Sequence, residues 1–232
     1  MKTATLTLFI FIVHIYNVNA QKDKHLVNAG EDINNVIPTE EKFHYPEFTA
    51  ASVVFKDGKI SVAPCNYNLL IGQMQFVDPS GDTLAIANEN TIEYININTD
   101  TFFYDNGYLQ LIAGNTSAKF AKSEKIKLSD IKKTGGFGQS SSTNGISTYS
   151  SLYVGGQRTE LTEKRELTLL RQTSFYIGNQ FNHFLPATKK NLIKLFGKKQ
   201  DRIETYLKEN NTSFNSEEDL KKLVSFINET SF

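Results

Sequence analysis

Two carboxylates frame a short polar stretch in the run FVDPSGDTLAI, residues 76–86. Asp78 and Asp82 stand four positions apart around Pro-Ser-Gly. Calcium binds such oxygen ligands, but the run lacks the alternating carboxylates of an EF-hand loop. Aspartates also accept hydrogen bonds from nearby backbone N–H groups in tight turns. Four apolar residues of one parity flank the stretch: Met74, Phe76, Leu84 and Ile86. They would meet on one buried face of a hairpin, so we predict a turn without a metal ion.

Two clusters of amide side chains beside aromatic rings are the candidate ligand-binding residues. Their members are Asn66, Tyr67 and Asn68 in the first, and Asn179, Phe181, Asn182 and His183 in the second. Amides form hydrogen bonds and rings stack, so such sets can bind a sugar or a peptide. The alternative is that the rings belong to the core and the asparagines to turns at strand ends.

Other chemistries lack their motifs in this sequence. His25, His44 and His183 are far apart and no CxxC is present, so we expect no metal site of the zinc type. No G-x-S-x-G motif occurs, and paired acids such as Glu89 and Glu93 fall in predicted turns or strands. The Gly-rich run 135–138 opens no helix and has no Lys-Ser/Thr pair, which argues against nucleotide binding. The sequence thus predicts no cofactor. It leaves enzymatic activity uncertain and favours a protein that is not an enzyme.

The first twenty residues, MKTATLTLFIFIVHIYNVNA, have the pattern of a secretory signal peptide. Lys2 provides the positive start, residues 4–16 are almost wholly apolar, and Val18 and Ala20 are the small residues of a cleavage site. The apolar run is shorter than the roughly 20 residues that span a bilayer. We therefore expect an exported protein, periplasmic, outer-membrane-associated or extracellular, with no transmembrane segment after cleavage.

Charge and cysteine content narrow the partners and the source of stability. The chain has 25 basic and 25 acidic residues and a formal net charge of zero. Nucleic acids and anionic membranes are bound largely through excess Lys and Arg, so we expect neither as a partner. Cys65 is the single cysteine, which rules out an intramolecular disulfide. Its apolar surroundings predict a small buried side chain rather than a nucleophile.

Composition divides the chain into four predicted regions. Residues 1–20 are the signal peptide and residues 21–48 an extended or disordered lead-in. Residues 49–186 form a β-rich domain with a mobile Gly/Ser loop at 134–151, and residues 187–228 form a helical cap.

Turn signals predict an antiparallel arrangement of the β-rich domain. Short β-rich runs are separated by gaps of three to five residues with Asn, Asp or Gly, too short for a parallel crossover. Asp57-Gly58 predicts a type I′ hairpin turn. Runs 166–172 and 174–181 predict two further strands that pack on the first sheet. The fold class is therefore α+β: an antiparallel β-meander, sandwich- or barrel-like, with a small C-terminal cap of three short helices.

Apolar residues at helical spacing and capping residues define the three helices of the cap. Thr188 can cap the first helix, which Gly197 ends, and residues 200–209 make the second. Ser216 precedes the third helix, residues 217–228. Each helix is amphipathic and must bury its apolar stripe against another element.

Two runs carry a resemblance to a known family. They are NYNLLIGQMQFVDPSGDTLAIAN, residues 66–88, and TSFYIGNQFNHFLPATKKNLIKLFGKKQDRIETYLKEN, residues 173–210. Together they resemble an uncharacterised family of secreted proteins of Bacteroidota-type Gram-negative bacteria, with a β-rich N-terminal region, a Gly/Ser loop and a Lys-rich helical tail. The resemblance implies an envelope location and brings no activity, cofactor or catalytic residue. Cys65 departs from the family pattern, which puts a shared role for its thiol in doubt.

The resemblance also points to one modification site. Asp82-Thr83-Leu84 looks like the acceptor for O-glycosylation in such bacteria, an aspartate followed by Ser or Thr and an aliphatic residue. The alternative is that Thr83 is simply a β-branched residue at the start of a strand.

Two functions from different classes remain. The first is a non-catalytic secreted or periplasmic interaction module, a subunit of an outer-membrane or cell-surface assembly whose partner is an envelope protein or glycan. The alternative is a small hydrolase or carbohydrate-binding protein acting on envelope polymers, which would need a concave pocket with convergent acids.

Overall fold

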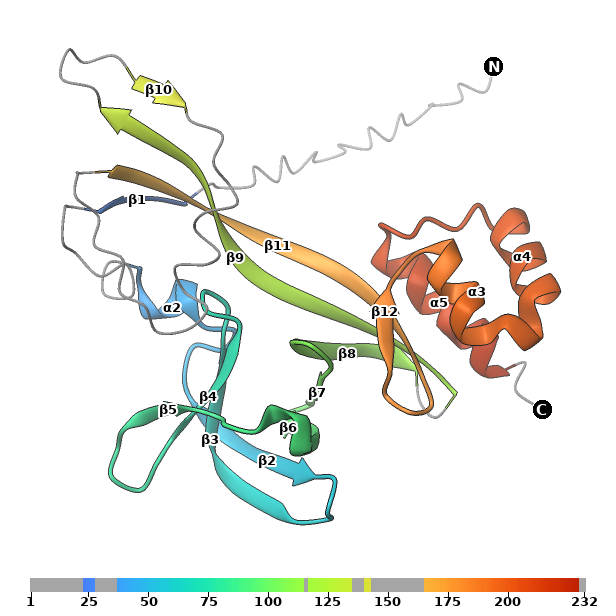
Figure 1. Cartoon of the computed structure of the whole chain (residues 1–232), viewed down its shortest axis with the longest axis horizontal. Coiled ribbons are helices and arrows are strands. Elements are labelled where there is room, and N and C mark those ends of the chain that lie inside the picture. Colours follow the sequence, from blue (N-terminus) through green and yellow to red (C-terminus); the bar gives the residue numbers. More distant parts are fainter. Residues whose placement is uncertain (1–22, 28–36, 115–116, 135–139, 143–164, 230–232) are drawn as a thin grey trace, which may run out of the picture.

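The computed structural model describes residues 23–27, 37–114, 117–134, 140–142 and 165–229 (Figure 1). The predicted signal peptide, residues 1–20, lies outside them. None of the helices in these ranges is long and apolar enough to cross a membrane.

A single antiparallel sheet dominates the described residues. Its strands are β1 Asp23–Val27, β2 Thr49–Phe55, β3 Ile60–Asn68, β4 Gln73–Val77, β5 Thr83–Ala85, β6 Ile92–Ile97, β7 Asp100–Tyr104, β8 Tyr108–Gly114, β9 Ala118–Thr134, β10 Ser140–Ser142, β11 Arg165–Asn179 and β12 Phe184–Pro186. The main path runs β1-β11-β9-β8-β7-β6-β2-β3-β4-β5, while β10 pairs with β9 and β12 with β11. The predicted α+β class is confirmed: a meander-like, open antiparallel sheet with three C-terminal helices.

The β2–β3 hairpin forms where Asp57-Gly58 predicts it, but the predicted turn type is wrong. Gly58 has φ +85°, whereas Asp57 is not among the residues with positive φ. The N–H of Gly58 bonds to the Phe55 carbonyl and the N–H of Phe55 to the Lys59 carbonyl, each at 2.9 Å. This is the pattern of a type I turn followed by a left-handed glycine. The Asp57 carboxylate accepts the Lys59 N–H at 3.0 Å, which favours the conformation found.

The β4–β5 hairpin confirms the predicted turn at Asp78. Its Oδ1 accepts the N–H groups of Ser80 at 2.8 Å and Asp82 at 2.9 Å. The predicted shared buried face holds only in part. Met74 is fully buried, whereas Leu84 is 46% exposed because β5 is the last strand of the path and nothing covers it among the described residues.

A long β9–β11 pair carries the sheet toward the helices (Figure 1). The prediction of two strands at 166–172 and 174–181 is wrong, because β11 continues through Thr173, which pairs with Glu124. Two parts of the predicted Gly/Ser loop are strand: Thr134 ends β9, and Ser140–Ser142 forms β10. The rest of that loop lies outside the described residues.

The strands from β9 through β3 curl around the first core cluster. The N–H of Ile126 in β9 donates to the carbonyl of Leu69, just after β3, at 2.9 Å, although four strands separate β9 from β3 in the path. The enclosed cluster consists of Ile37, Ala51, Val53, Cys65, Tyr67, Leu69, Leu70, Met74, Ile92, Ile95, Ile97, Phe102, Tyr108 and Ile126. Apolar burial of this extent is the main favourable term in the stability of the β region.

The folded region begins earlier than the predicted boundary near residue 49. Within the predicted lead-in, β1 pairs with β11, and α2, Thr39–Lys42, leads into Phe43, which bridges to Asn68. Ile37 and Phe43 are 2% and 9% exposed, so this segment contributes to the core.

The C-terminal helices are α3 Lys189–Phe196, α4 Gln200–Glu209 and α5 Glu217–Glu229, with the short 3-10 helix η2 Gly197–Lys199 between α3 and α4. The predicted caps are confirmed: Thr188 Oγ1 accepts the Asn191 N–H and Ser216 Oγ accepts the Asp219 N–H, each at 3.2 Å. Gly197 is right-handed, so the chain turns into η2 instead of stopping.

A second core cluster joins the helices to the sheet. Its buried members are Ala118, Phe120, Ile177, Leu192, Ile203, Leu220, Leu223, Val224 and Ile227. Asn228 fastens α5 to the start of β9, since it exchanges two hydrogen bonds with the backbone of Ala118, at 2.8 and 2.9 Å. The helices therefore cover one end of the sheet, as Figure 1 shows.

Candidate functional site

Both asparagines of the first predicted cluster are structural. Asn66 is 1% exposed and holds the segment before β2, because its Oδ1 accepts the Tyr45 N–H and its Nδ2 donates to the carbonyls of Tyr45 and Glu47. Asn68 is 5% exposed and its Oδ1 accepts the N–H groups of Leu70 and Ile71 in the turn after β3. The alternative of a strand-end turn describes Asn68, whereas Asn66 lies within β3 and bonds to a distant segment.

Tyr67 is buried in the first core cluster. It is 2% exposed, and its ring packs against Phe102 at 6.1 Å and Tyr108 at 5.8 Å between centroids. Burial raises the pKa of its hydroxyl above the usual value. No external ligand can stack on this ring.

The second predicted cluster is a loop that docks on the β6–β8 region. Asn179 Oδ1 accepts the N–H groups of Phe181 at 3.0 Å and His183 at 3.2 Å, which shapes the loop. Asn182, with φ +56°, donates from Nδ2 to Glu93 Oε1 at 2.8 Å. His183 Nδ1 lies 3.5 Å from Asp105 Oδ2. Gln180, Phe181, which is 77% exposed, and the half-exposed His183 ring are the side chains of this loop open to solvent.

The two predicted clusters do not form one site. Asn179 pairs with Ala118 at one end of β9, whereas Tyr67 lies by Glu124, six residues along the same strand. At about 3.3 Å per residue the clusters are roughly 20 Å apart. Thr83 is exposed on β5, so its hydroxyl is accessible, and its modification stays a prediction.

A polar cavity beneath Tyr67 was missed by the sequence interpretation. It is lined by His44, Tyr67, Phe102, Tyr108, Gln110, Lys122 and Glu124 and has a volume of about 10 Å³. These residues come from the segment before β2 and from β3, β7, β8 and β9, so no spacing in the sequence indicates that they line one cavity. Only the alternation that places Tyr108 and Gln110 on one face of β8, and Lys122 and Glu124 on one face of β9, could have hinted at it.

His44 and Glu124 look like an acid–base pair but cannot act as one on a substrate. His44 Nδ1 is 3.7 Å from Glu124 Oε2, and Lys122 Nζ is 3.3 Å from the same oxygen. Burial lowers the pKa of His44, against the raising effects of Glu124 and Asp100. A cavity of about 10 Å³ holds about one water molecule, so no sugar or peptide reaches these groups.

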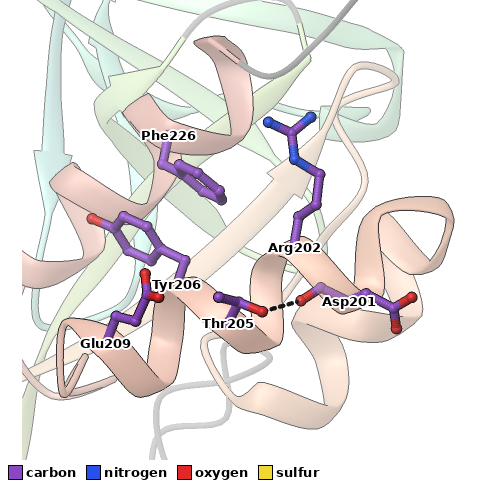
Figure 2. Close-up of a pocket in the computed structure, with 6 residues that line it drawn as sticks. All are labelled: Asp201, Arg202, Thr205, Tyr206, Glu209 and Phe226. Carbon is purple, nitrogen blue, oxygen red and sulfur yellow. Dashed lines mark hydrogen bonds between the residues drawn. The ribbon is translucent and has the colours of Figure 1, made fainter.

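An open pocket lies on the helical cap, between α4 and α5. It has a volume of about 300 Å³ and is lined by Asp201, Arg202, Thr205, Tyr206, Glu209 and Phe226, which we call the α4–α5 pocket. Figure 2 shows Tyr206 of α4 beside Phe226 of α5, with Arg202 and Glu209 toward opposite ends. The two rings stack with centroids 4.3 Å apart and planes at 21°.

The α4–α5 pocket is shaped by helical spacing. Residues 201, 202, 205, 206 and 209 recur every three or four positions, so their side chains share one face of α4. Thr205 Oγ1 donates to the Asp201 carbonyl at 2.9 Å, a bond within the helix that leaves the rim charges of Asp201, Arg202 and Glu209 exposed (Figure 2). No sequence signal marks this face of α4, because charged residues on a short helix are typical of any solvated surface.

Metal and thiol chemistry find no support at these positions. The described residues contain no group of three or more His, Cys, Asp or Glu side chains that could hold a metal ion. Cys65 is fully buried, as predicted, and burial raises the pKa of its thiol to about 11.

Comparisons of the chain with protein-family models, with curated proteins and with solved structures give no match.

Proposed function

We propose that this protein is a non-catalytic interaction module of the bacterial envelope that binds a partner protein through the α4–α5 pocket. The observation that carries the proposal is a pair of stacked aromatic rings, Tyr206 and Phe226, within an exposed rim that carries positive and negative side chains. Protein interfaces have this anatomy, an apolar centre enriched in aromatic residues and Arg within a polar rim. The N-terminal signal-peptide pattern supports an exported location.

A protein partner fits the pocket better than a glycan does. Sugars bind by stacking on the free face of a ring, whereas Tyr206 and Phe226 stack on each other at 4.3 Å and so each occupies a face of the other. Rim charges of both signs, from Asp201, Arg202 and Glu209, match an uncharged glycan poorly and a polypeptide well.

The spacing of the acids argues against hydrolysis. Asp201 and Glu209 are eight residues apart on α4, roughly 12 Å along the helix axis. Glycosidases hold their two carboxyl groups about 5–9.5 Å apart across the scissile bond. Glu204, on a neighbouring face of α4, is paired with Lys189 at 3.3 Å.

Apolar side chains exposed on β3 give this module a second surface of the same character. Ile60 and Val62 are 64% and 70% exposed and stand two positions apart, on one face of the strand. Exposed apolar groups of this kind favour an interaction role over an enzymatic one.

Site-specific crosslinking in intact envelopes tests the proposal. A photo-crosslinking amino acid at Thr205 should capture one defined protein. Arg202→Glu should reduce the yield of that product at least tenfold, because it reverses the positive charge of the rim. Lys198→Glu is the matched control, since Lys198 is exposed on η2 outside the pocket. An equal loss of product in both variants, or capture of glycan alone, would refute the proposal.

A further inference from the structure

Four buried polar atoms without a protein partner belong to residues that line the cavity beneath Tyr67. They are His44 Nδ1, Tyr67 Oη, Tyr108 Oη and Gln110 Oε1. All four residues line the same cavity, and no other buried side-chain nitrogen or oxygen of the described residues lacks a partner. A buried polar group without a hydrogen bond destabilises the folded state, so four of them on the lining of one cavity indicate a missing partner.

Neighbouring polar side chains do not supply that partner. Ser123 lies near the Tyr67 hydroxyl and Glu89 near the Tyr108 hydroxyl, close enough to affect the pKa of each tyrosine. Neither makes a hydrogen bond of acceptable geometry with the tyrosine hydroxyl. Both hydroxyls are therefore left without a hydrogen-bond partner among the described residues.

The strands hold these atoms in fixed positions. Gln110 of β8 lies between Phe102 of β7 and Lys122 of β9 in the ladder, and Tyr108 is two positions along the same face of β8. Tyr67 comes from β3 and closes the cavity because the sheet curls. Tyr67 and Tyr108 are 2% and 1% exposed, so the bulk solvent does not reach their hydroxyls freely.

The charges that line the cavity balance. Lys122 Nζ and Glu124 Oε2 are 3.3 Å apart, one positive and one negative group. Burial favours the uncharged form of His44 at neutral pH. A cation would meet the ammonium of Lys122 and an anion the carboxylate of Glu124, so the lining favours an uncharged occupant.

The hydrogen-bonding capacities match one molecule. The two tyrosine hydroxyls can donate, the Gln110 oxygen accepts, and neutral His44 accepts at Nδ1 when its proton is on Nε2. A water molecule accepts two hydrogen bonds and donates two. The volume of about 10 Å³ is the space that one water molecule needs.

We propose that the cavity is a binding site for one ordered water molecule, which accepts from Tyr67 and Tyr108 and donates to Gln110 and His44. This water bridges β3, β8 and the segment before β2. It makes the N-terminal segment part of the polar interior of the sheet.

Two measurements on the full chain test this site. A crystal structure near 1.5 Å resolution should show one density peak within about 2.6–3.2 Å of all four atoms. Oxygen-17 magnetic relaxation dispersion should then count one long-lived water fewer in Gln110→Leu and in Tyr108→Phe than in the unchanged protein. Gln73→Leu, at an exposed position of β4, is the control and should keep the count.

Each contrary outcome overturns the proposal. An empty cavity in the density, with Tyr108 bonded to Glu89 and Tyr67 to Ser123, would show that the protein satisfies its own groups. Anomalous scattering from the peak would identify an ion. An unchanged water count in both folded variants, with Gln73→Leu also unchanged, would place the long-lived waters elsewhere.

Discussion

Burial decides what each reactive side chain can do in this protein. Cys65, Tyr67 and His44 have types that often carry chemistry, yet each is held in the interior by the curl of the sheet. The polar residues of the predicted clusters are likewise occupied with backbone groups or with neighbouring loops. Side chains open to solvent include those of the α4–α5 pocket, Ile60 and Val62 of β3, and Phe181 in the loop before β12.

The thiol of Cys65 is expected to react slowly. It is fully buried, and its pKa is raised to about 11, so little thiolate exists at neutral pH. We predict that a thiol reagent labels the native protein at pH 7.5 at least a hundredfold more slowly than the protein in denaturant. The measurement is the rate of thiol labelling followed by absorbance, and comparable rates in the two conditions would contradict it.

Acid is expected to destabilise the fold through His44. Its folded-state pKa lies below the unfolded value of about 6.5, so the unfolded chain binds the proton first. The contribution to stability is complete above about pH 6.5 and is lost as the pH falls from there through the folded-state pKa. The groups that surround His44 are Glu124, Asp100, Lys122 and Arg171.

Chemical denaturation between pH 7.5 and 5 measures this effect. In His44→Gln the free energy of unfolding should fall less over that range than in the unchanged protein. His183→Gln is the control, because His183 is more than half exposed in a surface loop. Identical pH profiles for all three proteins would show that His44 does not couple folding to protons.

At the level of elements, close packing of β11 on β12 depends on one glycine. A Cβ added to Gly178 would lie 2.5 Å from the ring of Phe184, which is 5% exposed and packs on Phe103. Gly197 offers the opposite case, with nothing within 4 Å and a right-handed backbone.

We predict opposite signs for two alanine substitutions. Gly178→Ala should lower the free energy of unfolding by about 1–3 kcal/mol, because the ring of Phe184 has to move. Gly197→Ala should raise it by up to about 1 kcal/mol, because alanine loses less conformational freedom in helical backbone. Urea denaturation monitored by circular dichroism checks both, and a stable Gly178→Ala protein would show that β12 moves at no cost.

Elements with local signals were predictable and those held by distant contacts were not. Thr188, Ser216 and the Asp78 turn act within a few residues, so the sequence interpretation located them correctly. No local signal tells that β11 runs unbroken past Thr173, since only its pairing with β9 defines it. The polar cavity was not predictable for the same reason, because its lining comes from five separate segments.

At the scale of the molecule, the helices and the sheet are joined by a shared core and by Asn228. Asn228 donates to and accepts from the Ala118 backbone, 110 positions earlier in the chain. Val224 of the same helix lies against Gly114, where an added Cβ would approach within 2.8 Å. The cap and the sheet should therefore unfold together.

Asn228→Ala is predicted to weaken this joint. Loss of the two hydrogen bonds should lower the free energy of unfolding by about 1–3 kcal/mol. Because the cap and the sheet unfold together, hydrogen exchange should become faster in α5 and in β2 and β3 alike. Asn210→Ala, which removes a bond within an exposed helix end, is the control. Faster exchange in α5 alone would mean that this helix opens independently of the sheet.

The hydrogen bond between Ile126 and Leu69 has a consequence for the order in which the protein can be completed. A ribosome makes the chain from its N-terminus, so residues 37–114 exist before the strand that closes their core. Strand β1 can pair only later still, because Leu169 of β11, the partner of Asp23, is made 146 residues after it. Contacts so distant in sequence form late and slowly. The emerging chain therefore stays open and unfinished until its second half has been synthesised.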